Sequence, residues 1–160
     1  MDLDGFALPV KKLKGTDPVE MLDLSCKNLG VASAVVIASL ISFNGALTSL
    51  NLSSNNLCSV RETGYIKASQ VQGSSFNEGD KVVYLRFICK EMIVSKAIDR
   101  DGDIKMTNLP HMSGLNALAN ALRVNGALTM CDLRDNYVGE EGKALICNAA
   151  EGKAGFKLHL

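Results

Sequence analysis

The chain has 160 residues, of which 47% are apolar, and its 17 basic side chains balance 17 acidic ones. A chain of this length forms about one domain with enough apolar material for a core, and balanced charge creates no field toward nucleic acid or an anionic membrane. The opening residues MDLDGFALPVKK contain no apolar stretch of signal-peptide length, and the apolar residues 31–41 are far too few for a membrane span. We therefore expect a cytoplasmic protein, with the nucleus as the alternative compartment.

Residues 1–18 come first, and the stretch FALPVKKLK over 6–14 is expected to cap the segments that follow. Three later segments share one pattern: VEMLDLSCKNL from Val19, LTSLNLSSNNL from Leu47 and LTMCDLRDNYV from Leu128. Apolar residues alternate with polar ones in the middle of each segment, which predicts a short strand with one buried face. The residues GFKLHL at 155–160 continue this alternation and predict a final strand.

Apolar residues at helical spacing over 33–41, 114–122 and 142–150 predict three helices of about three turns each. The pentapeptide NGALT occurs at 44–48 and again at 125–129, between a helix and the next strand. We expect its Gly to take a positive φ at the end of the helix. The segments start at 19, 47 and 128, so they lie 28 and 81 residues apart; because 81 exceeds 28 by 53, one segment carries an insertion.

The segment LTSLNLSSNNL resembles the leucine-rich repeat signature L-x-x-L-x-L-x-x-N-x-L, and the 28-residue period resembles its ribonuclease-inhibitor-like class. The resemblance covers residues 19–57 and 112–160. It implies an α/β fold in which a short solenoid has parallel strands on a concave face and helices on a convex face, with an inserted antiparallel β subdomain. It also implies that Asn55 and Asn136 hydrogen-bond the turn backbone, whereas the first segment has Lys27 at that position.

We divide the chain on this basis into four parts. They are an N-terminal cap at 1–18, the first repeat with the strand and turn of the second at 19–57, the insertion at 58–110, and the remainder at 111–160. The insertion is poor in leucine, and 65–71, 80–88, 91–98 and 103–109 are predicted as four strands. Its sequence resembles a small SH3-like barrel of the Tudor or KOW type. In such barrels an aromatic cage holds methylated side chains, but we favour core packing for the four aromatic residues available, Tyr65, Phe76, Tyr84 and Phe87.

No enzyme or metal signature is found. The five cysteines lack Cys-x-x-Cys spacing, and neither His111 nor His159 has a Ser, Cys or acid at a catalytic spacing. The acidic stretch Asp99–Asp103 could hold Ca²⁺, but it lacks the later ligands of a calcium loop, and a hairpin turn explains it better. We therefore expect no catalytic residue, no metal and no cofactor.

The remaining candidate is the face of the predicted strands, where equivalent positions of neighbouring segments form rows. We expect these rows to bind a protein or peptide partner without catalysis, with methionine and acidic side chains suited to a basic or partly apolar peptide. In one alternative the inserted barrel recognises a modified peptide or nucleic acid; in another the chain is the end piece of a larger repeat assembly, so monomer and assembly both remain open. The candidate partner-binding residues are Met21, Asp23, Ser25, Ser49, Asn51, Ser53, Met130, Asp132 and Arg134.

Overall fold

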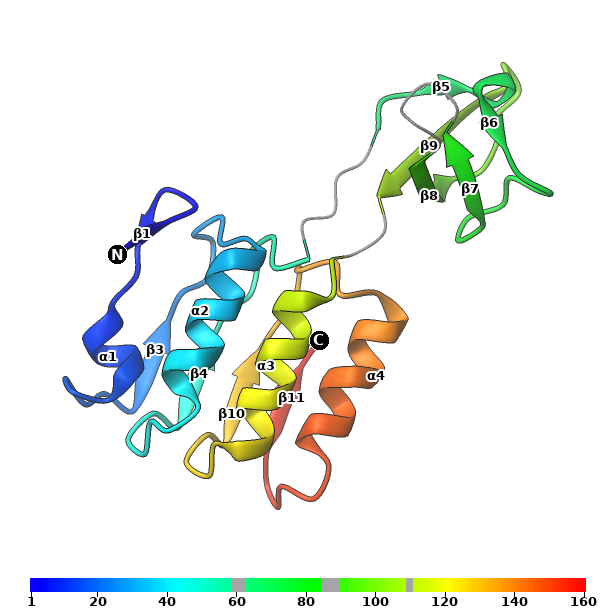
Figure 1. Ribbon diagram of the computed structural model, residues 1–160. Coiled ribbons are helices and arrows are strands. Elements are labelled where there is room, and N and C mark those ends of the chain that lie inside the picture. Colours follow the sequence, from blue (N-terminus) through cyan, green and yellow to red (C-terminus); the bar gives the residue numbers. More distant parts are fainter. Residues whose placement is uncertain (59–62, 85–89, 109–110) are drawn as a thin grey trace. The chain divides into compact units, whose positions relative to one another are not determined.

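Figure 1 shows the computed structural model of the chain, which describes residues 1–58, 63–84, 90–108 and 111–160. The chain divides into two compact units. Unit 1 joins Met1–Ser59 to Pro110–Leu160, and unit 2 is Val60–Leu109. Unit 2 starts two residues later and ends one residue earlier than the insertion expected at 58–110.

Unit 1 begins with a small antiparallel hairpin, followed by helices that alternate with three-residue strands. The strands of the hairpin are β1 (Asp2–Leu3) and β2 (Phe6–Ala7), and a left-handed Asp4–Gly5 turn joins them. The elements that follow are α1 (Val10–Lys14), β3 (Met21–Asp23), α2 (Val31–Ile41), β4 (Ser49–Asn51), α3 (Ser113–Val124), β10 (Met130–Asp132), α4 (Gly139–Ala150) and β11 (Lys157–His159).

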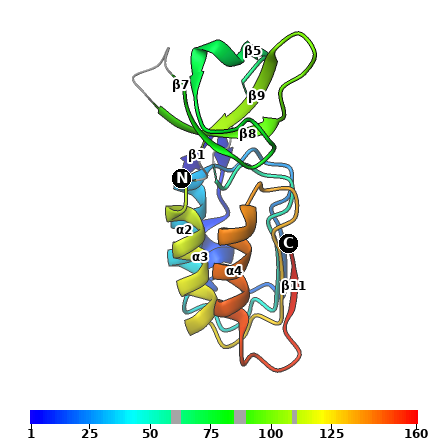
Figure 2. The ribbon, with the colours of Figure 1, turned by 90° about the vertical axis from the view of Figure 1, so that its right-hand side faces the viewer.

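The three-residue strands form one parallel sheet in the order β11-β10-β4-β3. Its register aligns Leu22, Leu50, Cys131 and Leu158 across the four strands. Leu50 is fully buried and Cys131 is 1% exposed, because these side chains point toward the helices that cover one face of the sheet. Figure 2 shows α2, α3 and α4 on that side. The alternation of apolar residues thus gives the sheet one buried face, and each fully buried Leu contributes about 1.5–3 kcal/mol of hydrophobic stabilisation.

The N-terminal hairpin caps α2 from a distance. The Asp4 carboxylate accepts hydrogen bonds from the backbone N–H of Gly30 at 2.7 Å and from the Ser33 hydroxyl. Both groups lie at the N-terminus of α2, where backbone N–H groups have no partner within the helix. The hydrogen bond from Ser33 is the main reason that the pKa of Asp4 lies below its usual value. The segment predicted as an N-terminal cap therefore supplies the Asp4 carboxylate, which caps the N-terminus of α2.

The expected positive φ at the NGALT glycines is wrong. Gly45 and Gly126 are not among the residues with positive φ, and a Cβ on either would meet no atom within 4 Å. The left-handed residues lie instead in the loops that follow the strands, at the equivalent positions Cys26, Ser54 and Asp135. The helices end differently because the Asn of NGALT uses its side chain to satisfy the terminal backbone, as described below.

Unit 2 is a five-stranded antiparallel sheet in the order β5-β9-β8-β7-β6. Residues 65–71, predicted as one strand, form two short strands separated by a 3₁₀ turn at Ala68–Gln70. The turn sends β5 to pair with β9 at one edge and β6 to pair with β7 at the other, so the sheet nearly closes on itself. The strands are β5 (Ile66–Lys67), β6 (Val71–Gln72), β7 (Lys81–Tyr84), β8 (Lys90–Lys96) and β9 (Asp103–Asn108).

The fold class expected from the sequence, a solenoid whose parallel strands line a concave face, is wrong. The described residues form four helices and mixed sheets: an antiparallel hairpin, four parallel strands of three residues each, and a nearly closed antiparallel sheet. The curvature of a solenoid accumulates through a small rotation from each unit to the next. Four such short strands are too few to build a concave face, so the sequence period sets the register of one small sheet instead.

Candidate functional site

The candidate residues share the face of the parallel sheet that lies away from the helices. The sheet register places Met21, Ser49 and Met130 side by side, with Lys157 continuing the row. Met21 is 73% exposed, and Ser49 and Met130 are half-buried. The Ser49 hydroxyl lies 4.0 Å from the Met130 sulfur. The first row therefore presents two methionines, of which Met21 is the more accessible, with the exposed Lys157 at its end.

The second row consists of Asp23, Asn51 and Asp132, and each of these side chains has the same structural role. The Asp23 Oδ1 accepts a hydrogen bond from the backbone N–H two residues later at 2.9 Å, and Asn51 and Asp132 do the same at 3.0 and 3.1 Å. This contact closes a turn at the end of each strand. The row predicted for recognition thus also shapes the loops that follow the strands.

Asp132 and Arg134 form an ion pair on this face. The guanidinium donates from Nη2 to Asp132 Oδ2 at 2.6 Å and from Nε to Oδ1 at 3.0 Å. Arg134 keeps the pKa of Asp132 below its usual value, and the Asp132 side chain is only 7% exposed. The carboxylate is therefore neutralised within the chain, which leaves Asp23 as the accessible acid of the second row.

The third row contains Ser25, Ser53 and Arg134. Ser25 and Ser53 are half-buried, whereas the Arg134 side chain is 58% exposed. The backbone N–H of Ser53 is the donor in the Asn51 turn described above. The rows thus bring the predicted residues onto one face, and Met21, Asp23 and Arg134 are the exposed ones among them.

Asn55 lies under the loops and bridges two neighbouring segments. Its Oδ1 accepts hydrogen bonds from the backbone N–H groups of Lys27 and Leu29, each at 3.0 Å. Its Nδ2 donates to the carbonyl oxygens of Leu24 and Leu52, each at 2.9 Å. Asn55 is 6% exposed, so the amide satisfies buried backbone groups that the short strands do not reach.

Asn136 repeats this arrangement one segment later. Its Nδ2 donates to Leu52 at 2.8 Å and to Leu133 at 3.0 Å, and its Oδ1 accepts from the backbone N–H of Leu57 at 3.3 Å. At 1% exposure it offers no surface to a partner. Asn55 and Asn136 are therefore part of the scaffold beneath the candidate site.

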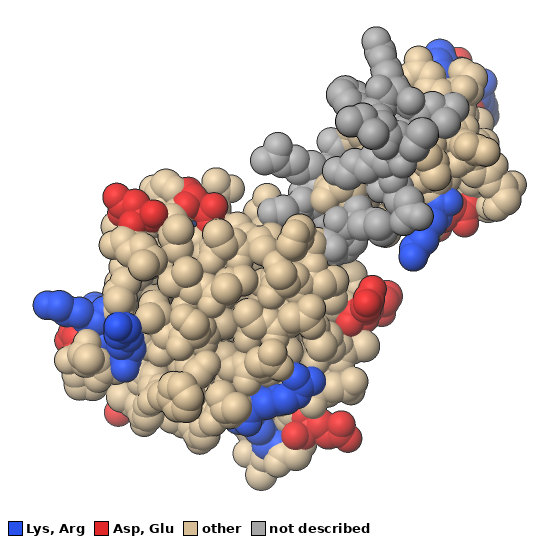
Figure 3. Space-filling model, in the orientation of Figure 1, with Lys and Arg blue, Asp and Glu red and all other residues tan. Residues whose placement is uncertain are grey.

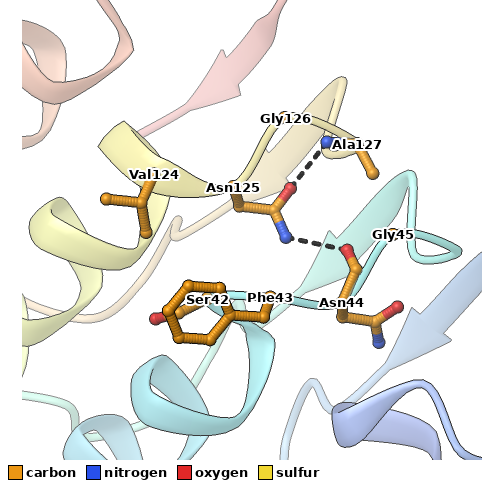
Figure 4. A pocket seen from close by; sticks show the side chains of 8 residues that line it. All are labelled: Ser42, Phe43, Asn44, Gly45, Val124, Asn125, Gly126 and Ala127. Atoms are coloured by element: carbon orange, nitrogen blue, oxygen red, sulfur yellow. Dashed lines mark hydrogen bonds between the residues drawn. The ribbon is translucent and has the colours of Figure 1, made fainter.

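A second pair of buried amides was missed by the sequence analysis, although NGALT itself is their signal. Asn44 Oδ1 accepts from the backbone N–H groups of Ala46 and Leu47, and its Nδ2 donates to Lys12 and Leu13. Figure 4 shows the equivalent Asn125, which accepts from Ala127 at 2.9 Å and donates to the Asn44 carbonyl at 3.0 Å. The repeated pentapeptide is thus a structural joint.

A shallow hollow of about 480 Å³ lies between these two joints. Phe43 and Val124 occupy equivalent positions beside it, directly before Asn44 and Asn125, and they are 91% and 62% exposed. Figure 4 shows both side chains and the two asparagines that separate them from the following glycines. This surface lies at the end of the helices, on a different part of unit 1 from the rows of the sheet.

The remaining chemical candidates do not assemble a reactive site. No group of three or more His, Cys, Asp or Glu side chains is placed to hold a metal ion among the residues that the structure describes. His111 Nδ1 lies 2.9 Å from the hydroxyl of Ser113, but both residues are exposed and only two positions apart. Burial raises the pKa of Cys58 to about 11 and that of Cys131 to about 12, so these thiols are poor nucleophiles.

In unit 2, Tyr65 is already in contact with lysines of the same chain. The ammonium groups of Lys96 and Lys105 lie 5.3 and 4.8 Å from the centre of its ring, and Lys96 also donates to the hydroxyl at 2.7 Å. Phe76 packs against the core of unit 2, while Phe87 and the Tyr84 side chain lie outside the described residues. A Tyr ring that contacts two internal cations is a poor wall for a cage that binds an external one.

The acidic stretch of unit 2 is a turn between β8 and β9. Asp99 Oδ1 accepts hydrogen bonds from the backbone N–H groups of Asp101 and Asp103 at 3.0 and 2.9 Å. Asp103 also pairs with Lys67 at 2.9 Å. One carboxylate oxygen of Asp99 is thus engaged by the backbone and one of Asp103 by a lysine.

Neither the models of known protein families nor the curated protein sequences contain a match to this chain. Among the helices in the described ranges, none combines the length and the apolar character that crossing a membrane requires.

Proposed function

We propose that unit 1 is a non-catalytic module that binds a protein or peptide through the face of its parallel sheet. The proposal depends on one observation. The helices α2, α3 and α4 cover one face of the sheet, and no described helix of unit 1 covers the other (Figure 2). Parallel sheets are usually covered on both faces, and here the second face carries Met21 at 73% exposure beside Asp23. A partner would supply the missing cover.

The side chains favour a partner segment with one apolar and one basic side chain. Met21 and Met130 provide adaptable apolar contact in the first row. Asp23, whose pKa is lowered chiefly by the backbone N–H of Ser25, stays ionised at neutral pH, while Asp132 is already paired with Arg134. A Lys or Arg of the partner would therefore pair with Asp23, and an apolar neighbour would pack on Met21.

We place the protein in the cytoplasm or nucleus, where thiols stay reduced. Cys26 and Cys147 are exposed free thiols, a usage that fits a reducing compartment. A fluorescent fusion in cells would show this location directly. Secretion of the fusion would contradict it.

The binding proposal is tested with a displayed library of random peptides selected against the full chain. Each selected peptide is then measured against Asp23→Asn and Met21→Ala. At the equivalent position of the next segment, Asn51 accepts the same backbone hydrogen bond that Asp23 accepts. Asp23→Asn therefore removes the charge and keeps the turn. We expect each variant to weaken binding by about tenfold, the effect of losing roughly 1.4 kcal/mol.

The matched control is Glu140→Gln, which removes an exposed carboxylate from the first turn of α4. It should leave peptide affinity unchanged. Peptides that bind the Asp23 and Met21 variants as tightly as the wild-type chain would contradict the proposed face. So would a library that yields no peptide at all.

A further inference from the structure

The outward side of α2 is apolar, in contrast to the outward sides of its neighbours. Its inner side carries buried apolar residues such as Ile37 and Ile41. Its outer side, which faces solvent, carries no charged residue either. Helices that are apolar all round are normally buried. Exposed residues at intervals of three or four positions, three on α2 and the last in the turn directly after it, define what we call the α2 stripe: Ala32, Val35, Ser39 and Phe43.

The α2 stripe can be buried without leaving a polar group unsatisfied. Its only polar side chain is Ser39, whose hydroxyl already donates to the carbonyl oxygen of Val36 at 3.1 Å. Val35 is 40% exposed, and Phe43 is 91% exposed although a buried Phe contributes more to an interface than almost any other side chain. Val124, 62% exposed, extends the apolar surface beside Phe43 onto α3.

Charges surround this surface: basic side chains gather in the last turns of α1 and α3, with Asp17 and Glu151 at the same end, and carboxylates lie at the opposite end. In Figure 3 the area over α2 and α3 is uncharged, and Lys, Arg, Asp and Glu lie around its margins. The last turn of α1 carries Lys11, Lys12 and Lys14, and that of α3 carries Arg123. At the opposite ends of the helices lie Asp2 of the hairpin and Glu141 in the first turn of α4, whereas Asp4 caps α2 and Glu140 pairs with Lys143 at 2.8 Å.

We propose that the α2 stripe is the contact between two copies of this chain, packed face to face with their α2 helices antiparallel. A two-fold axis then places Phe43 of each copy against Ala32 of the other, so the largest side chain of the stripe faces the smallest. Val35 and Ser39 lie near the axis. The same rotation brings the basic ends of one copy to the acidic ends of the other, whereas parallel helices would bring like charges together.

The size of the stripe indicates that the flanking helices take part. The 11 residues of α2 span about 16 Å, and a standard interface buries about 800 Å² of each partner. The contact must therefore include the charged margins on α1 and α3, which gives the interface an apolar centre and a charged rim. Because the exposed face of the parallel sheet lies on the other side of unit 1, such a dimer leaves this face free in each of the two copies.

The experiment is sedimentation equilibrium of the full chain, at concentrations up to roughly 100 μM because interfaces of standard size bind at micromolar affinity or better. We expect a concentration-dependent dimer. Ala32→Glu and Phe43→Lys should each weaken it by about 100-fold, since each places a charge in an apolar contact. Both residues face away from the core, and circular dichroism establishes that each variant is folded.

The double variant with both substitutions distinguishes this arrangement from other dimers. Residue 32 lies in the first turn of α2 and residue 43 in the turn that follows the helix. They are therefore about 16 Å apart, too far to pair within one copy. Across the proposed axis, however, each introduced carboxylate meets an introduced ammonium group, so the double variant should regain the dimer. Met21→Asp, on the sheet face, should leave it unchanged.

Three results would overturn the proposal. One is a wild-type chain that stays monomeric over the whole concentration range. Another is a dimer that persists in both single variants, which would locate the contact elsewhere. The third is a folded double variant that is no more associated than the single ones, which would exclude the antiparallel arrangement.

Discussion

Unit 1 and unit 2 satisfy their backbone polar groups in different ways. In unit 1 the strands of the parallel sheet are only three residues long, and buried amide side chains such as Asn55 and Asn125 bridge the loops and helix ends on either side of them. In unit 2 the longer strands β8 and β9 pair with each other, and the core is a small cluster around Val94, Ile104 and Met106. Short parallel strands depend on particular side chains, whereas an antiparallel sheet supplies its own hydrogen bonds.

The largest expected effect is the loss of one bridging amide in unit 1. Asn55→Ala removes the hydrogen bonds of the buried Leu29 N–H, the partly buried Lys27 N–H and the Leu24 carbonyl oxygen, so the free energy of unfolding of unit 1 should fall by about 3–5 kcal/mol. Denaturant unfolding, followed by a signal from each unit, measures the change. Unit 2 should be unaffected.

The adjacent Asn56 is the matched control for this prediction. Its Oδ1 is buried and has no hydrogen-bond partner among the described residues. Asn56→Ala should therefore change stability far less than Asn55→Ala. Equal losses from the two variants would show that amide bridging is not what distinguishes unit 1.

A smaller effect is expected from crowding the helix layer of unit 1. A Cβ at Gly114 would lie 2.9 Å from the Ala34 Cβ and 3.0 Å from the carbonyl oxygen of Leu57, neither of which can move aside easily. Gly114→Ala should lower the unfolding free energy by about 1–3 kcal/mol. Gly126→Ala is the control, since its Cβ meets no atom within 4 Å, and it should be neutral or slightly stabilising. A neutral Gly114→Ala would mean that α2 and α3 are less closely packed.

Removing the distant cap of α2 should cost less again. Asp4→Asn weakens the contacts with Gly30 and Ser33 and should lower the unfolding free energy by about 1 kcal/mol at neutral pH. The pKa of Asp4 is lower in the folded chain than its ordinary value of 3.8. The stabilisation is therefore complete above pH 3.8 and is lost as the pH falls through the folded pKa.

The difference in stability between the wild-type chain and Asp4→Asn should accordingly shrink as the pH falls below 3.8. Thermal unfolding of both proteins over a pH series measures this difference. A difference that stays constant at low pH would show that the carboxylate charge of Asp4 does not hold the hairpin to α2.

The smallest effect is expected from separating the two units. In unit 1 the backbone N–H of His111 donates to the carbonyl oxygen of Cys58 at 2.8 Å, so the described residues on either side of 59–110 lie next to each other, and deleting residues 59–109 leaves a short connection between them. We expect the deletion to leave unit 1 folded, with an amide NMR spectrum close to that of the same residues in the full chain. A collapsed, poorly dispersed spectrum would show that unit 1 needs unit 2.

Sequence patterns predicted the strands of unit 1 better than those of unit 2, because the unit 1 strands follow from the alternation of neighbouring residues. Alternating leucines around Leu50 identify a strand and its buried face, and a repeated spacing identifies which strands lie in register. The expected single strand at 65–71 was wrong because its split depends on pairing with two different edges, β7 and β9. Asp132 and Arg134 are close in the sequence, but only the structure shows that they form an ion pair. This pair neutralises one of the two acids predicted to bind a partner.

By itself, the sequence determined the short parallel strands and the three long helices of unit 1, because each is carried by neighbouring residues. Tertiary structure alone decided the fold class, the cap made by Asp4 and the role of NGALT. Asn125 illustrates the reason: its amide donates to carbonyl groups 81 and 84 residues earlier in the chain. A pattern of neighbouring residues contains no record of such distant partners, so the local signal suggested a flexible glycine where the structure uses an asparagine.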